Sequence, residues 1–148
     1  MADWTDPSAV YLCDTQAKVL SIKSAMDTSS PDDPGTVLPP PKYRPLTSAK
    51  NFKCTFGRVS VRASTEVQGP HPTGTCAGFT HTYIHSFQVN GKLLFSGMQS
   101  FNSACFSDPE LYEIEVRQIG TKVHIKTCYA TWDWGVGYKQ DRCDAQDL

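Results

Sequence analysis

The chain has 148 residues, a length that fits one domain of ordinary size. Hydrophobic residues make up 39% of it and charged residues 20%, and no apolar run approaches the roughly 18 residues of a membrane-spanning helix, so neither a disordered tail nor a membrane span is expected. The 14 basic and 15 acidic side chains give a net charge of -1, which argues against nucleic acid or an anionic membrane as a partner. We therefore expect a single globular domain over residues 1–148.

The first part of the chain predicts one strand followed by a long loop. Residues 17–23 favour a strand, because Val-Leu-Ser-Ile lies next to a turn-rich segment. Residues 29–46 contain six prolines, which neither continue a helix nor donate to a regular ladder, so we expect an extended, partly polyproline-like loop. A linker between two domains is disfavoured, because the segment before it is too short for a core of its own.

The rest of the chain predicts strands and turns. Residues 52–67 alternate between apolar and polar side chains and change phase at Gly57, which predicts one long strand with a bulge or bend. Asn90-Gly91 predicts a hairpin with a type I′ turn within 79–95, and Gly120-Thr121 predicts a second hairpin within 111–127. The predicted fold class is all-β: an antiparallel β-sandwich, or partly open barrel, of six to eight strands, stapled by disulfides and carrying the long proline-rich loop.

Six cysteines are spread over the whole chain without any close pair. Structural zinc sites bring their ligands in close pairs, so we expect no metal, and no motif calls for a cofactor. An even, dispersed set in a small domain predicts three disulfides, and the alternative is six reduced cysteines acting as small buried hydrophobes. Fifteen connectivities are possible, and our prediction pairs Cys13 with Cys54, Cys76 with Cys105, and Cys128 with Cys143.

The cysteines also predict a compartment. Disulfides persist in oxidising surroundings, so a periplasmic or secreted location is expected. Met1-Ala2-Asp3-Trp4 contains no signal peptide, so this expectation requires a processed chain with an added initiator Met.

No residue pattern predicts catalysis. The nucleophile elbow, the phosphate-binding loop and the HExxH helix are all missing from the sequence. His81 and His85 lie on one face of a predicted strand, but four residues of strand cover roughly 13 Å, too far for one metal ion. We expect His71 and His124 to be surface or cross-strand hydrogen-bonding residues, and we assign no catalytic residue.

Charge is distributed unevenly along the chain. Residues 51–107 carry a balance of +3 and residues 108–148 a balance of -3. Glu113 and Glu115 lie on one strand face beside Arg117, and we expect them to form a solvated charge row. The acidic C-terminal region would suit a basic partner.

Residues 128–138 concentrate the aromatic side chains that dominate binding hot spots, since two tryptophans and two tyrosines occur there between glycines. We expect a loop at 132–138 that contacts a protein or a sugar, and the alternative is a plug over one open end of the sandwich. The predicted partner-binding residues are Trp132, Asp133, Trp134 and Tyr138, with Tyr43 and Arg44 from the proline-rich loop.

These features together predict a secreted or periplasmic domain that binds a protein, such as an inhibitor or immunity protein that neutralises a hydrolytic enzyme or toxin. Rigid loops lose little entropy on docking, which favours tight binding by a small domain. Two alternatives stay open. One is a carbohydrate-binding module with Trp132, Trp134 and Tyr138 as stacking platforms, and the other is an enzyme of unfamiliar type with His71 or His124 as its base.

Overall fold

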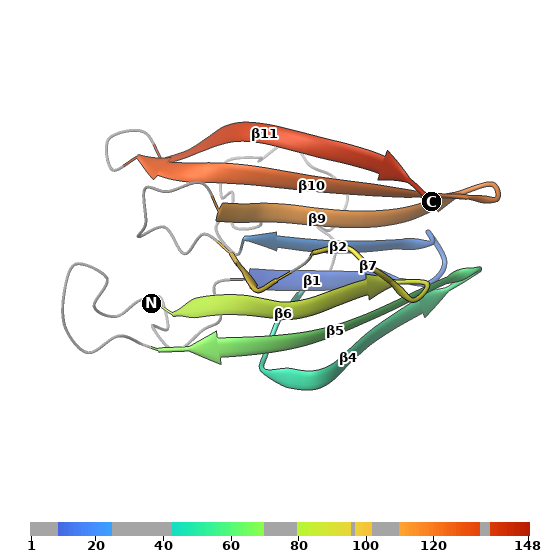
Figure 1. Ribbon diagram of the computed structural model, residues 1–148, viewed down its shortest axis with the longest axis horizontal. Helices are drawn as coiled ribbons and strands as arrows, with labels where there is room; N and C mark the ends of the chain where they lie inside the picture. Colours follow the sequence, from blue (N-terminus) through green and yellow to red (C-terminus); the bar gives the residue numbers. More distant parts are fainter. Residues whose placement is uncertain (1–8, 25–42, 70–79, 96, 102–109, 134–136) are drawn as a thin grey trace, which may run out of the picture.

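The structure is a computed structural model that describes residues 9–24, 43–69, 80–95, 97–101, 110–133 and 137–148. These residues form two antiparallel sheets and no helix (Figure 1). Eight strands have six or more residues and three have two, within the described part of the chain. The predicted all-β sandwich is therefore confirmed.

One sheet has six strands in the order β11-β10-β9-β2-β1-β3, and it fills the upper part of Figure 1. Its strands are β1 (Ala9–Asp14), β2 (Val19–Ser24), β3 (Arg44–Pro45), β9 (Glu110–Ile119), β10 (Lys122–Asp133) and β11 (Gly137–Asp147). The strand predicted at 17–23 corresponds to β2. The short β3 lies at one edge of this sheet and β11 at the other.

The second sheet has five strands. It consists of β4 (Ala49–Phe56), β5 (Val59–Gln68), β6 (His81–Val89) and β7 (Lys92–Leu93), with β8 (Gln99–Ser100) paired to β6. Just after β8, Phe101 forms a parallel bridge with Leu111 of β9, so the two sheets meet at this point.

A single cluster of buried apolar side chains fills the space between the sheets. The five-stranded sheet contributes every second residue of β4 and β5, which is the alternation seen in the sequence. The six-stranded sheet contributes residues of β2, β9 and β10. The fully buried large side chains are Leu20, Ile22, Leu46, Val59, Val61, Ile84, Phe87, Val89, Phe101, Leu111, Ile114 and Val116.

The two predicted hairpins are confirmed. Asn90 and Gly91 have φ of 51° and 81°, and positive φ at both central positions is the property of a type I′ turn. Gly120 has φ of 63° in the two-residue turn that joins β9 to β10. In both turns a glycine, which adopts positive φ at little steric cost, lies where the chain reverses.

The single strand predicted over 52–67 is wrong, because these residues form the hairpin β4–β5. Gly57 has φ of 51° and, with Arg58, makes a two-residue turn. Phe56 and Val59 flank this turn as register partners and both are buried, so the phase change in the sequence marks a reversal of the chain and not a bulge. A Cβ at position 57 would collide with the Gln118 side chain, whose Oε1 accepts the Arg58 N–H at 2.9 Å.

The proline-rich loop is described only at its end. Arg44 and Pro45 form β3, which pairs with Tyr11 and Val10 of β1, while residues 25–42 lie outside the described part. Leu46 follows directly and is buried, its backbone N–H donating to the Ala9 carbonyl at 2.9 Å. The loop therefore ends by joining the sheet edge.

Two of the three predicted disulfides are confirmed. Cys13 of β1 is bonded to Cys54 of β4, so this disulfide links the two sheets through the core. Cys128 is bonded to Cys143, its register partner on the neighbouring strand. The predicted Cys76–Cys105 pair lies outside the described residues. Two disulfides agree with an oxidising compartment.

The disulfide between the sheets should contribute strongly to stability. Because 41 positions separate Cys13 from Cys54, the double variant Cys13→Ala/Cys54→Ala should lose about 4 kcal/mol of unfolding free energy on the chain-entropy model. Urea denaturation measures this loss. The matched control, Cys128→Ala/Cys143→Ala, removes a disulfide that closes a shorter separation of 15, and it should lose about 3 kcal/mol. A smaller loss from the first pair than from the second would contradict the expectation.

Candidate functional site

The hairpin β10–β11 extends beyond the rest of its sheet. Register pairing between β10 and β9 ends at Ala130 with Glu110, whereas β10 and β11 stay paired as far as Asp133 with Gly137. Figure 1 shows this end of the two strands reaching past the start of β9. We call the paired residues 131–133 and 137–139 the distal hairpin. Its strands pair with each other and not with β9.

Two contacts secure the base of the distal hairpin. The Cys128–Cys143 disulfide ties the strands together where their Cα atoms are 4.0 Å apart. One register position further along, the Arg142 guanidinium lies over the Tyr129 ring, 4.4 Å from its centroid. A cation above an aromatic face is attracted by the ring quadrupole. A covalent bond and a cation–π contact therefore restrain the two strands before they leave the sheet.

The predicted loop at 132–138 is only partly a loop. Trp132 and Asp133 belong to β10 and Tyr138 to β11, with Trp132 and Tyr138 as register partners. The sequence concealed β11 because its residues are polar on both faces, so no alternation of apolar and polar residues marks it. The side chains at 132–138 lie outside the described part of the chain. Residues 134–136, and with them Trp134, lie outside it entirely.

Tyr43 and Arg44 lie far from the distal hairpin. Arg44 is on β3, at the opposite edge from β11, and five strand spacings correspond to about 24 Å across the sheet. The Tyr43 hydroxyl lies 3.2 Å from the Ser21 Oγ of β2, while exposed Arg44 lines a shallow hollow with Tyr11, Leu12 and Cys13. Arg44 therefore does not share one patch with the described backbone of Trp132, Asp133 and Tyr138.

Glu113 corrects the prediction of a solvated charge row. Its side chain is only 12% exposed, because a lysine on each neighbouring strand binds it. Lys126 Nζ lies 2.7 Å from Oε1 and Lys23 Nζ lies 3.5 Å from Oε2. Only Glu115 matches the expectation, with an exposed ion pair of 3.2 Å to Arg117 Nε. Sequence reasoning missed the Glu113 cluster because its lysines come from distant parts of the chain.

Each described histidine contacts a neighbouring side chain. His124 Nδ1 is paired with Asp147 across β10 and β11, which confirms the expected cross-strand contact. His85 Nε2 lies 2.8 Å from Glu66 Oε1 on the five-stranded sheet. His81 is 3% exposed and meets the Tyr83 ring edge-on, with centroids 6.0 Å apart. His71 lies outside the described residues.

Glu66 is held by two hydrogen bonds. The Gln68 side-chain amide donates to its Oε2, and His85 binds its Oε1. Both bonds favour the charged carboxylate, so the pKa of Glu66 lies below its ordinary value of 4.5, first through Gln68 and then through His85. The one acidic residue of the described five-stranded sheet is thus already engaged by neighbours.

Comparisons with family models, with curated proteins and with solved structures found no match to this chain. Within the described part, no three metal-binding side chains gather at one point, and no helix is long and apolar enough to cross a membrane.

Removing the Glu113 carboxylate should leave two neighbouring ammonium groups without their shared partner. We expect Glu113→Gln to lower the unfolding free energy by about 1–3 kcal/mol, because it removes a carboxylate that is only 12% exposed and binds two lysines. The control Glu115→Gln breaks an exposed pair and should cost less than about 1 kcal/mol. Urea denaturation of both variants checks this, and equal losses would contradict a stronger role for Glu113.

The pKa of Glu66 should rise when its partners are removed. We expect both Gln68→Ala and His85→Ala to raise it, because each removes a hydrogen bond that favours the charged carboxylate. The interaction stabilises the fold above the unfolded-state pKa of Glu66 and is lost as the pH falls through the folded-state pKa. A carboxyl-carbon NMR titration measures the pKa directly, and an unchanged value in Gln68→Ala would contradict the assignment.

Proposed function

We propose that this chain is a protein-binding domain of an oxidising compartment, secreted or periplasmic, that docks on its partner through the distal hairpin. The partner class that suits it best is a basic hydrolytic enzyme or toxin, which the domain neutralises as an inhibitor or immunity protein. No step of catalysis is assigned to the chain.

The observation that supports this proposal is the self-paired distal hairpin with a disulfide at its base. β9 pairing stops at Ala130, so the backbone beyond it is held by the hairpin itself and by the Cys128–Cys143 bond. A pre-ordered segment loses less conformational entropy on binding than a flexible loop does. A projecting, restrained hairpin that carries aromatic residues has the properties of an interface anchor.

Charge favours a basic partner. Residues 108–148 contain eight acidic and five basic side chains, and Asp133 stands at the end of β10 within the distal hairpin. Rim charges of opposite sign accelerate encounter and exclude wrong partners more than they add to affinity. An enzyme that acts on anionic cell-wall or nucleic-acid substrates would present such a basic surface.

A carbohydrate-binding module is the second candidate. Trp132 and Tyr138 are register partners, and register partners of an antiparallel pair occupy the same face. Two aromatic positions side by side on one face suit stacking on a sugar ring. The two candidates use the same residues, so the ligand that they bind separates them.

The distal hairpin is tested by two variants and a control. The chain is used to capture a partner protein from the extracellular fraction of the source organism, and this partner is identified. The affinity of the partner for each purified variant is then measured by calorimetry. We expect Trp132→Ala and Tyr138→Ala each to weaken binding at least about 30-fold, the loss typical of a hot spot of 2 kcal/mol. The control Lys122→Ala changes an exposed residue at the other end of β10 and should bind normally.

Thermal melting distinguishes the outcomes. Lost affinity with unchanged melting temperature supports a contact role. A melting temperature lower by several degrees in both variants would instead mean that these side chains support the fold, which contradicts the proposal. Binding to glycans without any protein partner, lost in Trp132→Ala and Tyr138→Ala, would favour the carbohydrate-binding module at the distal hairpin.

A further inference from the structure

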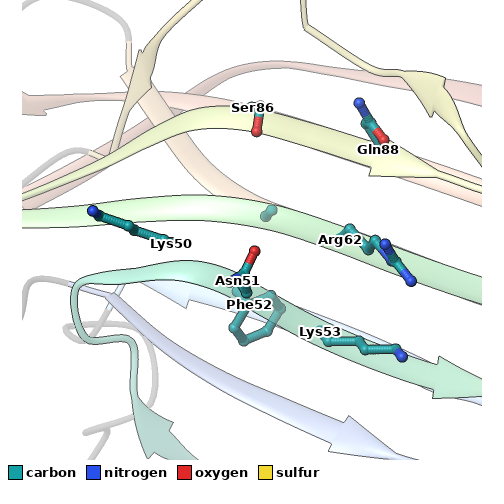
Figure 2. Close-up of a pocket in the computed structure, with 8 residues that line it drawn as sticks. Lys50, Asn51, Phe52, Lys53, Arg62, Ser86 and Gln88 are labelled. Carbon is teal, nitrogen blue, oxygen red and sulfur yellow. The ribbon is translucent and has the colours of Figure 1, made fainter.

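The outer face of the five-stranded sheet carries a row of polar and basic side chains across three strands. Lys53 of β4 is the register partner of Arg62 of β5, and Arg62 is the register partner of Gln88 of β6. All three are exposed. Figure 2 shows these three side chains on adjacent strands, with Lys50, Asn51 and Ser86 nearer the other end of the hollow.

Two β-bulges shape this face. Between Ala49 and Phe52, β4 places Lys50 and Asn51 opposite one residue of β5, and at the same level β6 has the extra residue His85. Bulges bend a strand and turn side chains in new directions. Here they border a shallow hollow of about 360 Å³, within the usual size range of ligand sites. Its lining residues are Lys50, Asn51, Phe52, Lys53, Arg62, Ala63, Ser86 and Gln88.

A second hollow continues the first. It has about 280 Å³ and is lined by Ser60, Arg62, Gln88, Asn90 and Gly91. Arg62 and Gln88 line both hollows, so the two hollows lie side by side at this pair of residues. We call the two hollows together the basic trough. An elongated depression accommodates several units of a chain molecule better than a single small ion.

The cations of the basic trough are not neutralised within the described part of the chain. Lys50, Lys53 and Arg62 form no ion pair there, whereas Lys23, Lys126 and Arg117 of the six-stranded sheet each bind a carboxylate. The described residues of 49–69 and 80–101 contain five basic side chains and only one acid, Glu66. Glu66 is already bound by His85 and Gln68.

The arrangement of Lys53 and Arg62 is unfavourable for stability. Like charges directly opposite on neighbouring strands destabilise a sheet, because their Cβ atoms are only about 5 Å apart. A feature that opposes stability and has no compensating contact is expected at functional sites. An anionic ligand between these two residues would remove the repulsion.

From this geometry we propose that the basic trough binds an acidic polysaccharide, with Lys53 and Arg62 binding its carboxylates. Arg presents a planar fork that matches a carboxylate with two hydrogen bonds. Asn51, Ser86 and Gln88 carry amide and hydroxyl groups that both donate to and accept from sugar hydroxyls.

The lining disfavours two other polyanions. Single-stranded nucleic acid stacks its bases on exposed aromatic side chains, but Phe52, the aromatic residue of the lining, is buried in the core. An acidic protein surface would be expected to meet an aromatic or apolar anchor at the centre of the interface. Here the centre is Arg62 and Gln88, and exposed Leu93 lies at the margin as the register partner of Gln88. The trough lies on the other sheet from the distal hairpin, so this inference does not depend on the proposed function.

The test uses oligogalacturonate, a uronic-acid chain, and dextran as a neutral chain of matched length. We expect calorimetry of the whole protein to detect oligogalacturonate binding that weakens as salt screens the charges. Arg62→Gln and Lys53→Gln should each weaken it about tenfold, the effect of one lost charge-assisted hydrogen bond. The control Lys122→Gln removes an exposed cation at the start of β10 that forms no ion pair with the described residues, and it should bind normally.

Stability provides a second readout. Because Lys53 and Arg62 repel each other, either variant should melt at the same temperature as the wild type or slightly higher. Binding that is unchanged in both variants, or lost equally in Lys122→Gln, would overturn the proposal. So would equal affinity for dextran, or tighter binding of oligothymidylate or polyglutamate than of oligogalacturonate.

Discussion

Burial of apolar side chains between the two sheets supports everything else in this molecule. Phe87 of one sheet and Leu20 of the other are completely withdrawn from water, and burying a side chain of this size contributes roughly 1.5–3 kcal/mol. The Cys13–Cys54 disulfide crosses the same interior. Because the inner faces and this bond hold the sheets together, the outer faces and the end of the β10–β11 hairpin are left available for binding.

The outer faces of the two sheets differ in how their charged side chains are paired. On the six-stranded sheet, Glu113 is shared by Lys23 and Lys126, so cations and carboxylate compensate one another across three strands. On the five-stranded sheet, Lys53 and Arg62 face each other without an acid between them in the described part of the chain. The first arrangement stabilises the fold. The second opposes it slightly, which is why we infer a ligand there and not on the other sheet.

Particular residues show how far sequence reasoning reached. Asn90-Gly91 identified its hairpin because the pair has an intrinsic preference for positive φ. Gly57 was misread, since a change of phase in a row of alternating side chains follows equally from a bulge and from a reversal between Phe56 and Val59. β11 was missed because its described side chains are exposed on both faces, and such a strand has no apolar period. The disulfide pairs Cys13–Cys54 and Cys128–Cys143 were predicted correctly, although spacing alone allowed other connectivities.

The alternation of apolar residues and the turn residues were enough to determine the class of fold, because both patterns depend on neighbours within a few positions. The number of cysteines was enough to indicate the presence of disulfides. The candidate sites depended on tertiary structure. Lys53, Arg62 and Gln88 come from three strands, and only the register of β4, β5 and β6 aligns them. Likewise, the strand order separates Arg44 from the distal hairpin across the full width of a sheet. Register and strand order are set by packing over the whole core, and no local stretch of sequence contains that information.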